Sequence, residues 1–242
     1  MSLVELLHVL ENGWSDSMSL NVRLALAGLL RSLVVIAALL FIPAWSLTYW
    51  QGWIYVAIMG AASAAIILYL AKHDDALIGR RLKAGPIAEK EKSQKIILAF
   101  TSVAGIILIL VPGFDYRWQW SHVPVALVST GFAGVALGFV IMFLVFRENS
   151  FSSAIVEVAK DQTVVSTGPY ALVRHPMYVG VILLFLATPL ALGSWWAFLP
   201  AIILSAMIAV RLIDEERFLG RNLPGYDAYR ADVRYRLVPG LW

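Results

Sequence analysis

The sequence predicts an all-α membrane protein, a bundle of about six membrane-spanning helices, and three observations lead to this fold class. Hydrophobic residues make up 60% of the 242 residues and charged residues 14%, whereas a soluble domain is usually about half apolar and a quarter charged. The apolar residues gather into runs long enough to cross a bilayer. Nearly all basic residues fall on one side of the predicted bundle. A chain of this length cannot bury so much apolar surface in a core, so the excess is expected to face lipid.

The predicted spans follow from the lengths of the apolar runs, because a hydrocarbon core of about 30 Å requires about 20 residues of helix. Trp45, Tyr49 and Trp53 are typical of the aromatic residues at a membrane interface. Gly134 and Gly138 have the spacing of a helix-packing contact. The last two runs are short and closely joined, which predicts a helical hairpin. The expected spans are residues 32–49, 53–71, 96–111, 123–146, 177–192 and 195–213.

The segments between the spans complete the predicted organisation. Residues 51–52 are expected to form a tight turn, and a Pro-Gly pair at residues 112–113 to close the third span. Residues 18–31 combine leucines with two arginines, which predicts an amphipathic helix lying on the bilayer. A C-terminal interfacial helix is expected after the last span. The predicted regions are an interfacial segment over 1–31, a four-span region over 32–146 and a catalytic region over 147–242.

The positions of the basic residues predict the orientation. With six spans, 18 of the 19 Lys and Arg residues fall on one side and only Arg117 falls on the other. Cytoplasmic loops are enriched in Lys and Arg, so both termini are expected in the cytoplasm. Five spans would place one basic cluster outside. The expected location is a bacterial inner membrane or the endoplasmic reticulum.

Two features of the composition exclude other classes. The chain has no cysteine, which rules out disulfides, thiol nucleophiles and cysteine-bound metals. The first twenty residues contain three acidic residues and no Lys or Arg, unlike a secretory signal. No nucleic-acid partner is expected, and the oligomeric state is not predicted.

The most informative segment is STGPYALVRHPMYVG, residues 166–180. Pro176 favours the first turn of a helix, so Arg174, His175 and Tyr178 are expected where the fifth span enters the membrane. Arginine and tyrosine are common anchors at that depth. Neither lipid nor the positive end of a helix requires His175, which makes it a candidate functional residue.

A second group of polar residues follows the sixth span, in the segment RLIDEER over residues 211–217. It holds three consecutive carboxylates near a helix C-terminus, where cations are favoured. Either they form a solvated face balanced by nearby arginines, or they bind a cationic ligand. Further along, Tyr226, Tyr229 and Val233 share a helix face that is expected to pack against the bundle.

The pattern GPYxxVRHPxYxG, a double glutamate about 35 residues later and then PGYxxYxxxVxxRLxPG resembles the isoprenylcysteine carboxyl methyltransferase family, part of a wider group with phospholipid methyltransferases. The resemblance covers residues 146–242. It implies a methyltransferase that uses S-adenosyl-L-methionine, bound between the start of the fifth span and the double glutamate. The implied cofactor-binding residues are Tyr170, Arg174, His175, Pro176, Tyr178, Gly180, Glu215 and Glu216, and the implied catalytic residues are Arg211 and His175.

Charge complementarity agrees with this implication. Carboxylates can hold the sulfonium and ammonium of S-adenosyl-L-methionine, and its carboxylate needs a donor such as Arg174 or the first N–H groups of a helix. Methyl transfer is an in-line displacement that depends on alignment and needs no metal. Arg211 could orient a carboxylate acceptor, whereas an amine or thiol acceptor needs a base, either His175 or a glutamate.

The acceptor is expected to be a lipophilic small molecule or a lipid-modified group that arrives through the membrane, at a site facing the cytoplasm. Membrane lipids are the other expected partners. Two alternatives remain open: a sterol-reductase-like enzyme that uses NADPH, and a non-enzymatic transporter or scaffold. The chain has no GxGxxG motif on a strand–helix–strand unit, the signature of a soluble dinucleotide-binding fold.

Overall fold

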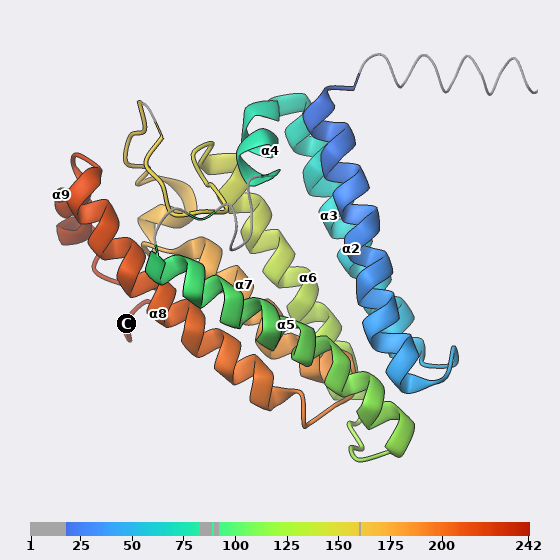
Figure 1. Cartoon of the computed structure of the whole chain (residues 1–242). Coiled ribbons are helices and arrows are strands. Elements are labelled where there is room, and N and C mark those ends of the chain that lie inside the picture. Colours follow the sequence, from blue (N-terminus) through green and yellow to red (C-terminus); the bar gives the residue numbers. More distant parts are fainter. Residues whose placement is uncertain (1–17, 83–88, 90–91, 160) are drawn as a thin grey trace, which may run out of the picture.

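The computed structural model describes residues 18–82, 89, 92–159 and 161–242, and within these ranges it contains helices and no strand. The all-α prediction is therefore confirmed. The elements in chain order are α2 (Leu20–Ala44), α3 (Trp50–His73), α4 (Asp75–Leu82), α5 (Lys92–Trp118), α6 (Val125–Glu148), η1 (Gly168–Ala171), α7 (Pro176–Ala191), α8 (Phe198–Asn222) and α9 (Tyr226–Asp232) (Figure 1).

The six long helices alternate in direction, so the bundle has two distinct ends (Figure 1). One end, called here the loop end, carries the short links over residues 45–49, 119–124 and 192–197. The other, called here the α4 end, carries α4, α9 and the long connection between α6 and α7. The two sequence motifs lie at the α4 end, since α7 begins there and α8 ends there.

Four helices, α2, α3, α5 and α6, are long and apolar enough to cross a membrane. Large hydrophobic side chains project from their surfaces, for example Leu24, Val34, Phe100 and Leu137. The fifth long helix, α7, has 16 residues and is only about 24 Å long. The chain is an integral membrane protein, while the number of spans and the side of the termini stay predictions.

Exposed tryptophans mark the loop end. Arg117 lies among them, with its guanidinium 5.3 Å from the ring centre of Trp45 and 5.6 Å from that of Trp118. This arrangement is typical of an interfacial aromatic belt. The exposed tryptophans at or near this end are Trp45, Trp50, Trp53, Trp118, Trp120, Trp195 and Trp196.

The first helix differs from the prediction. Its N-terminus is capped by Ser19, whose hydroxyl accepts a hydrogen bond from the backbone N–H of Val22, and it continues without a break to Ala44. The left-handed conformation of Trp45, with φ of 52°, ends it. A separate interfacial helix over 18–31 is therefore not formed, because residues 20–31 are the first half of α2. The predicted turn at residues 51–52 is also wrong, since both lie inside α3.

The third span also runs further than predicted, because α5 continues through Pro112 to Trp118. Gly113 allows α2 to approach so closely that a Cβ atom there would lie 2.5 Å from a backbone oxygen of α2. Beyond it, the buried carboxylate of Asp115 accepts hydrogen bonds from Ser121 and from Ser194. These tertiary contacts hold the helix past a proline that removes only one backbone donor.

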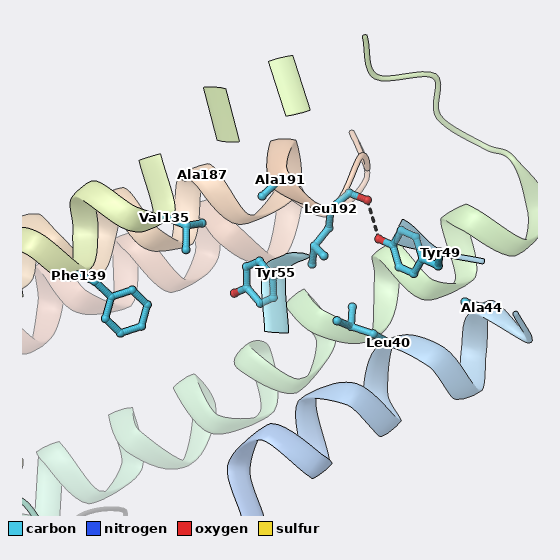
Figure 2. Close-up of a cluster of buried hydrophobic side chains, with 9 residues drawn as sticks. All are labelled: Leu40, Ala44, Tyr49, Tyr55, Val135, Phe139, Ala187, Ala191 and Leu192. Atoms are coloured by element: carbon cyan, nitrogen blue, oxygen red, sulfur yellow. Dashed lines mark hydrogen bonds between the residues drawn. The ribbon is translucent and has the colours of Figure 1, made fainter. Parts of the chain in front are cut away.

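The core at the loop end joins α2, α3, α6 and α7 (Figure 2). Tyr49 is fully buried here, and its hydroxyl donates a hydrogen bond to the backbone oxygen of Leu192 at 2.6 Å. Its side chain therefore packs inside the protein and does not face the lipid headgroups as a residue of the aromatic belt would. The residues of this cluster are Leu40, Ala44, Tyr49, Tyr55, Val135, Phe139, Ala187, Ala191 and Leu192.

The closest helix pair is α6 and α7, and a row of small residues explains it. A Cβ atom at Gly134 would lie 2.8 Å from the Cβ of Ala187, and one at Gly138 would lie 2.9 Å from the backbone oxygen of Gly180. Glycine therefore lets the two backbones touch. The predicted packing role of Gly134 and Gly138 is confirmed, and this contact fixes the position of α7.

Candidate active site

The start of α7 is held by the C-terminal segment of the chain. Pro176 occupies the first position of α7, where its missing N–H costs nothing. The two residues before it use their backbone N–H groups elsewhere: Arg174 donates to the oxygen of Tyr235 at 2.9 Å and His175 to that of Arg236 at 3.0 Å. The motif is therefore braced against a segment that lies about sixty residues later in the chain.

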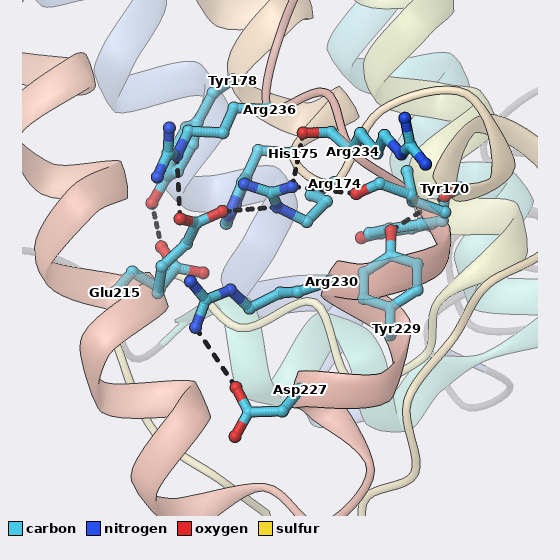
Figure 3. Close-up of polar contacts among 12 residues, drawn as sticks. Tyr170, Arg174, His175, Tyr178, Glu215, Asp227, Tyr229, Arg230, Arg234 and Arg236 are labelled. Carbon is cyan, nitrogen blue, oxygen red and sulfur yellow. Dashed lines mark hydrogen bonds and ion pairs between the residues drawn. The ribbon is translucent and has the colours of Figure 1, made fainter. Parts of the chain in front are cut away.

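A buried ionic cluster surrounds Glu216 (Figure 3). Its carboxylate accepts hydrogen bonds from Nε of Arg174 at 2.7 Å and from Nε of Arg236 at 2.9 Å, and it lies 3.3 Å from Nε2 of His175. Burial alone would raise the pKa of Glu216, but the hydrogen bonds from these three side chains outweigh it and place the pKa well below its usual range. The cluster joins α7, α8 and the C-terminal segment.

Arg174 is held by this cluster and by the backbone through Nε and Nη1. Besides Glu216, its guanidinium donates from Nη1 to the oxygens of Val233 at 2.8 Å and Arg234 at 2.7 Å (Figure 3). An arginine with so many protein partners stabilises the local fold. Its role as a donor to a cofactor carboxylate stays a prediction. Other donor groups of the site form fewer hydrogen bonds to the protein.

Glu215 lies on another side of α8 from Glu216, since neighbouring residues on a helix are about 100° apart. Its carboxylate accepts a hydrogen bond from the hydroxyl of Tyr178 (Figure 3). That hydroxyl in turn accepts one from Nε of Arg211 at 3.1 Å. The two glutamates of the motif thus have separate tasks: Glu216 belongs to the ionic cluster and Glu215 to a cavity.

The cavity has a volume of about 550 Å³, a size typical of small-molecule sites, and its polar residues lie at the α4 end. One part of its wall is polar and includes Tyr170, His175, Tyr178, Arg211 and Glu215. The other part is apolar and comes from α5, α7 and α8. Its apolar lining residues include Leu98, Gly105, Val181, Phe185, Leu204 and Ile208.

Two buried polar atoms on the cavity wall lack a hydrogen-bond partner among the described residues: Nη1 of Arg211 and the hydroxyl of Tyr226. Burying such groups without a partner is costly. The other guanidinium nitrogens of Arg211 are used, since Nη2 donates to the oxygen of Ala154 at 3.2 Å and lies 3.8 Å from Glu89. A bound polar ligand would satisfy both unpartnered donors.

Tyrosines frame the polar part of the cavity. The hydroxyl of Tyr170 accepts a hydrogen bond from Nδ2 of Asn149 at 2.9 Å, and its backbone oxygen accepts one from the hydroxyl of Tyr229 at 2.8 Å. Burial raises the pKa of Tyr170 to about 12, so it stays neutral at physiological pH. Tyr226 and Tyr229 also form a packed cluster with Val233, as predicted.

Most of the predicted site residues come together on this cavity, but two do not. Gly180 packs against Gly138 in the α6–α7 contact, and Glu216 faces the ionic cluster. Neither of these two lines the cavity, and their place in the cofactor site stays a prediction. The predicted residues that do line the cavity are Tyr170, Arg174, His175, Pro176, Tyr178, Arg211 and Glu215.

The structure adds lining residues that the sequence motifs do not contain. Arg81 comes from α4, Asn149 from the end of α6, and further residues from the connection over 151–157. Glu89 is buried beside Arg211 and accepts a hydrogen bond from the backbone N–H of Val156 at 3.2 Å. The sequence feature that contains Arg81 and Glu89 is the polar, highly charged stretch between the second and third spans. No local pattern in that stretch relates it to the site.

Comparison with known proteins identifies relatives of part of the chain. Residues 126–224 match the family model described as phospholipid methyltransferase. A nickel-cobalt-cadmium resistance protein, NccN of Alcaligenes xylosoxydans xylosoxydans, is 27% identical over 132 residues. That alignment covers 52% of this chain and 56% of the relative, so the chain spans about half of the relative's length. From α6 to the end of α8, which includes the RHPxYxG and double-glutamate motifs, the chain thus matches the phospholipid methyltransferase family, the group that includes the isoprenylcysteine carboxyl methyltransferases it resembles.

Proposed function

We propose that this integral membrane protein is a methyltransferase that uses S-adenosyl-L-methionine and methylates a lipophilic acceptor. The observation that carries the proposal is the coincidence of two features at the α4 end. The region matched by the methyltransferase family model contains both motifs, and residues of both motifs line one cavity that is polar on one side and apolar on the other. Such a cavity suits a polar cofactor beside an apolar acceptor.

The residues present fit the charges of the cofactor. Glu215 offers a carboxylate to a cationic group, and its one protein donor identified above is the hydroxyl of Tyr178. Arg211 and Tyr226 each have a buried donor without a partner, which suits a carboxylate. Arg174 already donates to Glu216 and to the backbone. Arg211 and Tyr226 are therefore better placed than Arg174 to donate to the cofactor's carboxylate. When bound, S-adenosyl-L-methionine supplies an electrophilic methyl group on a sulfonium.

The chain's own contribution would be to align the acceptor and to handle its charge. A carboxylate acceptor would be oriented by Arg211 in place of the cofactor's carboxylate, because Nη1 is the one guanidinium nitrogen of Arg211 without a partner among the described residues. An amine or thiol acceptor would lose its proton to a base, and the two candidates differ in position. Glu215 faces the cavity, whereas Nε2 of His175 points at Glu216. The geometry therefore favours Glu215 as the base.

The apolar part of the wall supports an acceptor with a hydrocarbon tail. Leu98 and Gly105 come from α5, which is long and apolar enough to cross the membrane, and Leu204 and Ile208 face them from α8. Each methylene held there would be stabilised by about 0.8 kcal/mol relative to water, most of which the lipid already supplies. The site would face the cytoplasm, where the soluble cofactor is available, and the tail would enter from the lipid.

Isothermal titration of the purified protein in nanodiscs, with S-adenosyl-L-methionine and separately with NADPH, tests the proposal. Binding of S-adenosyl-L-methionine alone is the expected result. Binding of NADPH without S-adenosyl-L-methionine would favour the reductase alternative instead.

The acceptor is tested by methyl transfer to a series with one headgroup and graded tails, corrected for partitioning into the bilayer. Catalytic efficiency per membrane-resident acceptor should rise with tail length until the apolar wall is covered, by less than the about fourfold per methylene that transfer from water would give. A flat series, or equal activity with a tailless analogue, would mean that the acceptor is not recognised through the membrane.

A further inference from the structure

Arg81 brings a positive charge to the cavity from outside the family-matched region 126–224. It lies in the last turn of α4 and is half-buried. Its Nη1 donates a hydrogen bond to the backbone oxygen of Ser152 at 3.2 Å. Its guanidinium lies 4.5 Å from the ring centre of Phe146, close enough for a cation–π contact. These contacts leave much of the donor fork of the guanidinium available to a ligand.

The position of Arg81 is fixed by the packing of α4. Leu77 and Ile78 are buried in a cluster with Val22 and Phe146. At the start of the helix, the Asp75 carboxylate accepts a hydrogen bond at 2.8 Å from a side-chain amide of α2. The guanidinium of Arg81 is therefore presented to the cavity by an anchored helix.

Arg81 differs from the other cavity arginines in its counter-ion. Arg174 pairs with Glu216 at 2.7 Å, and Arg211 lies 3.8 Å from Glu89. Within the described ranges, no carboxylate lies at ion-pair distance from Arg81. A half-buried cation without a counter-ion loses part of its hydration, which is costly. An anionic ligand group at this place would remove that cost.

The electrostatics of Arg81 agree with its placement. Burial lowers the pKa of Arg81 to about 10, and the nearby hydroxyls of Tyr170 and Tyr178 act in the opposite direction. The side chain is therefore still a cation at neutral pH. It is also close to the polar part of the cavity, where the head of a lipophilic acceptor would lie.

We propose that Arg81 binds an anionic group, a carboxylate or a phosphate, carried by the lipophilic acceptor. This inference rests on the proposed function, because it takes the apolar wall as the place of the acceptor's tail. The planar fork of arginine can donate two parallel hydrogen bonds to either anion. The cofactor's own carboxylate has other donors in the unpartnered groups of Arg211 and Tyr226.

The test measures binding of four probes to the full chain in nanodiscs of zwitterionic lipid by isothermal titration: decyl phosphate, decanoate, decanol and inorganic phosphate. Arg81→Gln should weaken binding of the two anionic decyl probes by about 10- to 150-fold, the effect of losing a charge-assisted hydrogen bond. Binding of decanol and of S-adenosyl-L-methionine should not change. Arg81→Lys, which keeps the charge without the fork, should lie in between.

Arg80→Gln is the matched control, because Arg80 is the preceding residue on α4 and lies 3.8 Å from Asp74. It should bind the decyl probes as the unchanged protein does. If Arg81→Gln melts at a lower temperature than the unchanged protein, the probe affinities of Arg81→Lys are compared with those of the unchanged protein instead.

Several outcomes would overturn the inference. One is that Arg81→Gln binds decyl phosphate and decanoate as tightly as the unchanged protein does. Another is that the unchanged protein binds neither probe. A third is that the unchanged protein binds inorganic phosphate as tightly as decyl phosphate, which would indicate a free-anion site. A loss of S-adenosyl-L-methionine affinity in Arg81→Gln would assign the arginine to the cofactor. Failure of the unchanged protein to bind S-adenosyl-L-methionine would contradict the proposed function instead, whatever the decyl probes do.

Discussion

Gly138 and Gly180 face each other across the α6–α7 contact, so that a Cβ atom on either would lie 2.9 Å from the backbone oxygen of the other. Gly180→Val should therefore force the two helices apart and destabilise the protein by about 1–3 kcal/mol, the usual cost of overpacking. Thermal unfolding in detergent measures this. Gly28→Ala is the control, because no atom lies within 4 Å of its added Cβ. Equal melting temperatures for Gly180→Val and Gly28→Ala would contradict the packing.

The two glutamates of α8 should respond differently to the same substitution. Glu216→Gln removes the counter-ion of buried Arg174 and of Arg236 and should lower stability by about 3 kcal/mol, as when a buried ion pair loses one partner. Glu215→Gln should leave stability nearly unchanged and weaken S-adenosyl-L-methionine binding by about 10- to 150-fold. Melting temperature and titration, measured on both variants, separate the two roles. The reverse pattern would mean that the roles are exchanged.

Glu216 should also give the protein an acid-sensitive contribution to stability. Its pKa in the folded protein lies well below the ordinary value of 4.5, because hydrogen bonds from His175, Arg174 and Arg236 outweigh its burial. A depressed pKa means that the contribution is complete above about pH 4.5 and decreases as the pH falls below that value. Melting temperatures from pH 7 down to pH 3 should fall more steeply for the unchanged protein than for Glu216→Gln. If the melting temperatures of the two proteins fell equally with pH, Glu216 would not be the source of the acid-sensitive stability.

The alternating helices predict the sidedness of the chain. α4, within the polar stretch over residues 72–95, and the C-terminal residue Trp242 both lie at the α4 end, the side to which the predicted six spans assign 18 of the 19 basic residues. Reporter fusions at both positions should therefore give a cytoplasmic signal. A fusion in the link over residues 119–124 serves as the control and should report the opposite side. An external signal from Trp242 would contradict an even number of spans.

Sequence reasoning located the helices better than their ends. Long apolar runs identify the spans because lipid-facing helices must be apolar along their whole length. The ends depend on contacts that no local pattern contains. Pro112 and Gly113 look like a stop, yet α5 continues because α2 packs on Gly113 and Asp115 is bonded to Ser121 and Ser194. The same applies to residues 51–52, which resemble a turn and form part of α3.

The candidate site could be predicted as far as its motifs extend. Tyr170, Tyr178, Arg211 and Glu215 line one cavity, as the resemblance implies. A motif does not indicate which side of a helix a residue occupies, and for this reason Glu216 was grouped with Glu215. Residues of the N-terminal half, such as Arg81, reach the cavity only through the packing of α4, which the sequence alone does not reveal.

The cavity wall is shared between two parts of the chain, and this has an evolutionary consequence. The polar residues of the two motifs lie on α7 and α8, whereas Arg81 and Leu98 come from α4 and α5, outside the family-matched region. On the proposed function, substitutions in α4 and α5 would therefore alter which acceptor is taken while the two motifs stay unchanged. Chimaeras that exchange these two helices between relatives should keep the cofactor and inherit the acceptor preference of the donor. If substrates diversified in such a lineage, the responsible substitutions would be found in the N-terminal half, outside the two motifs.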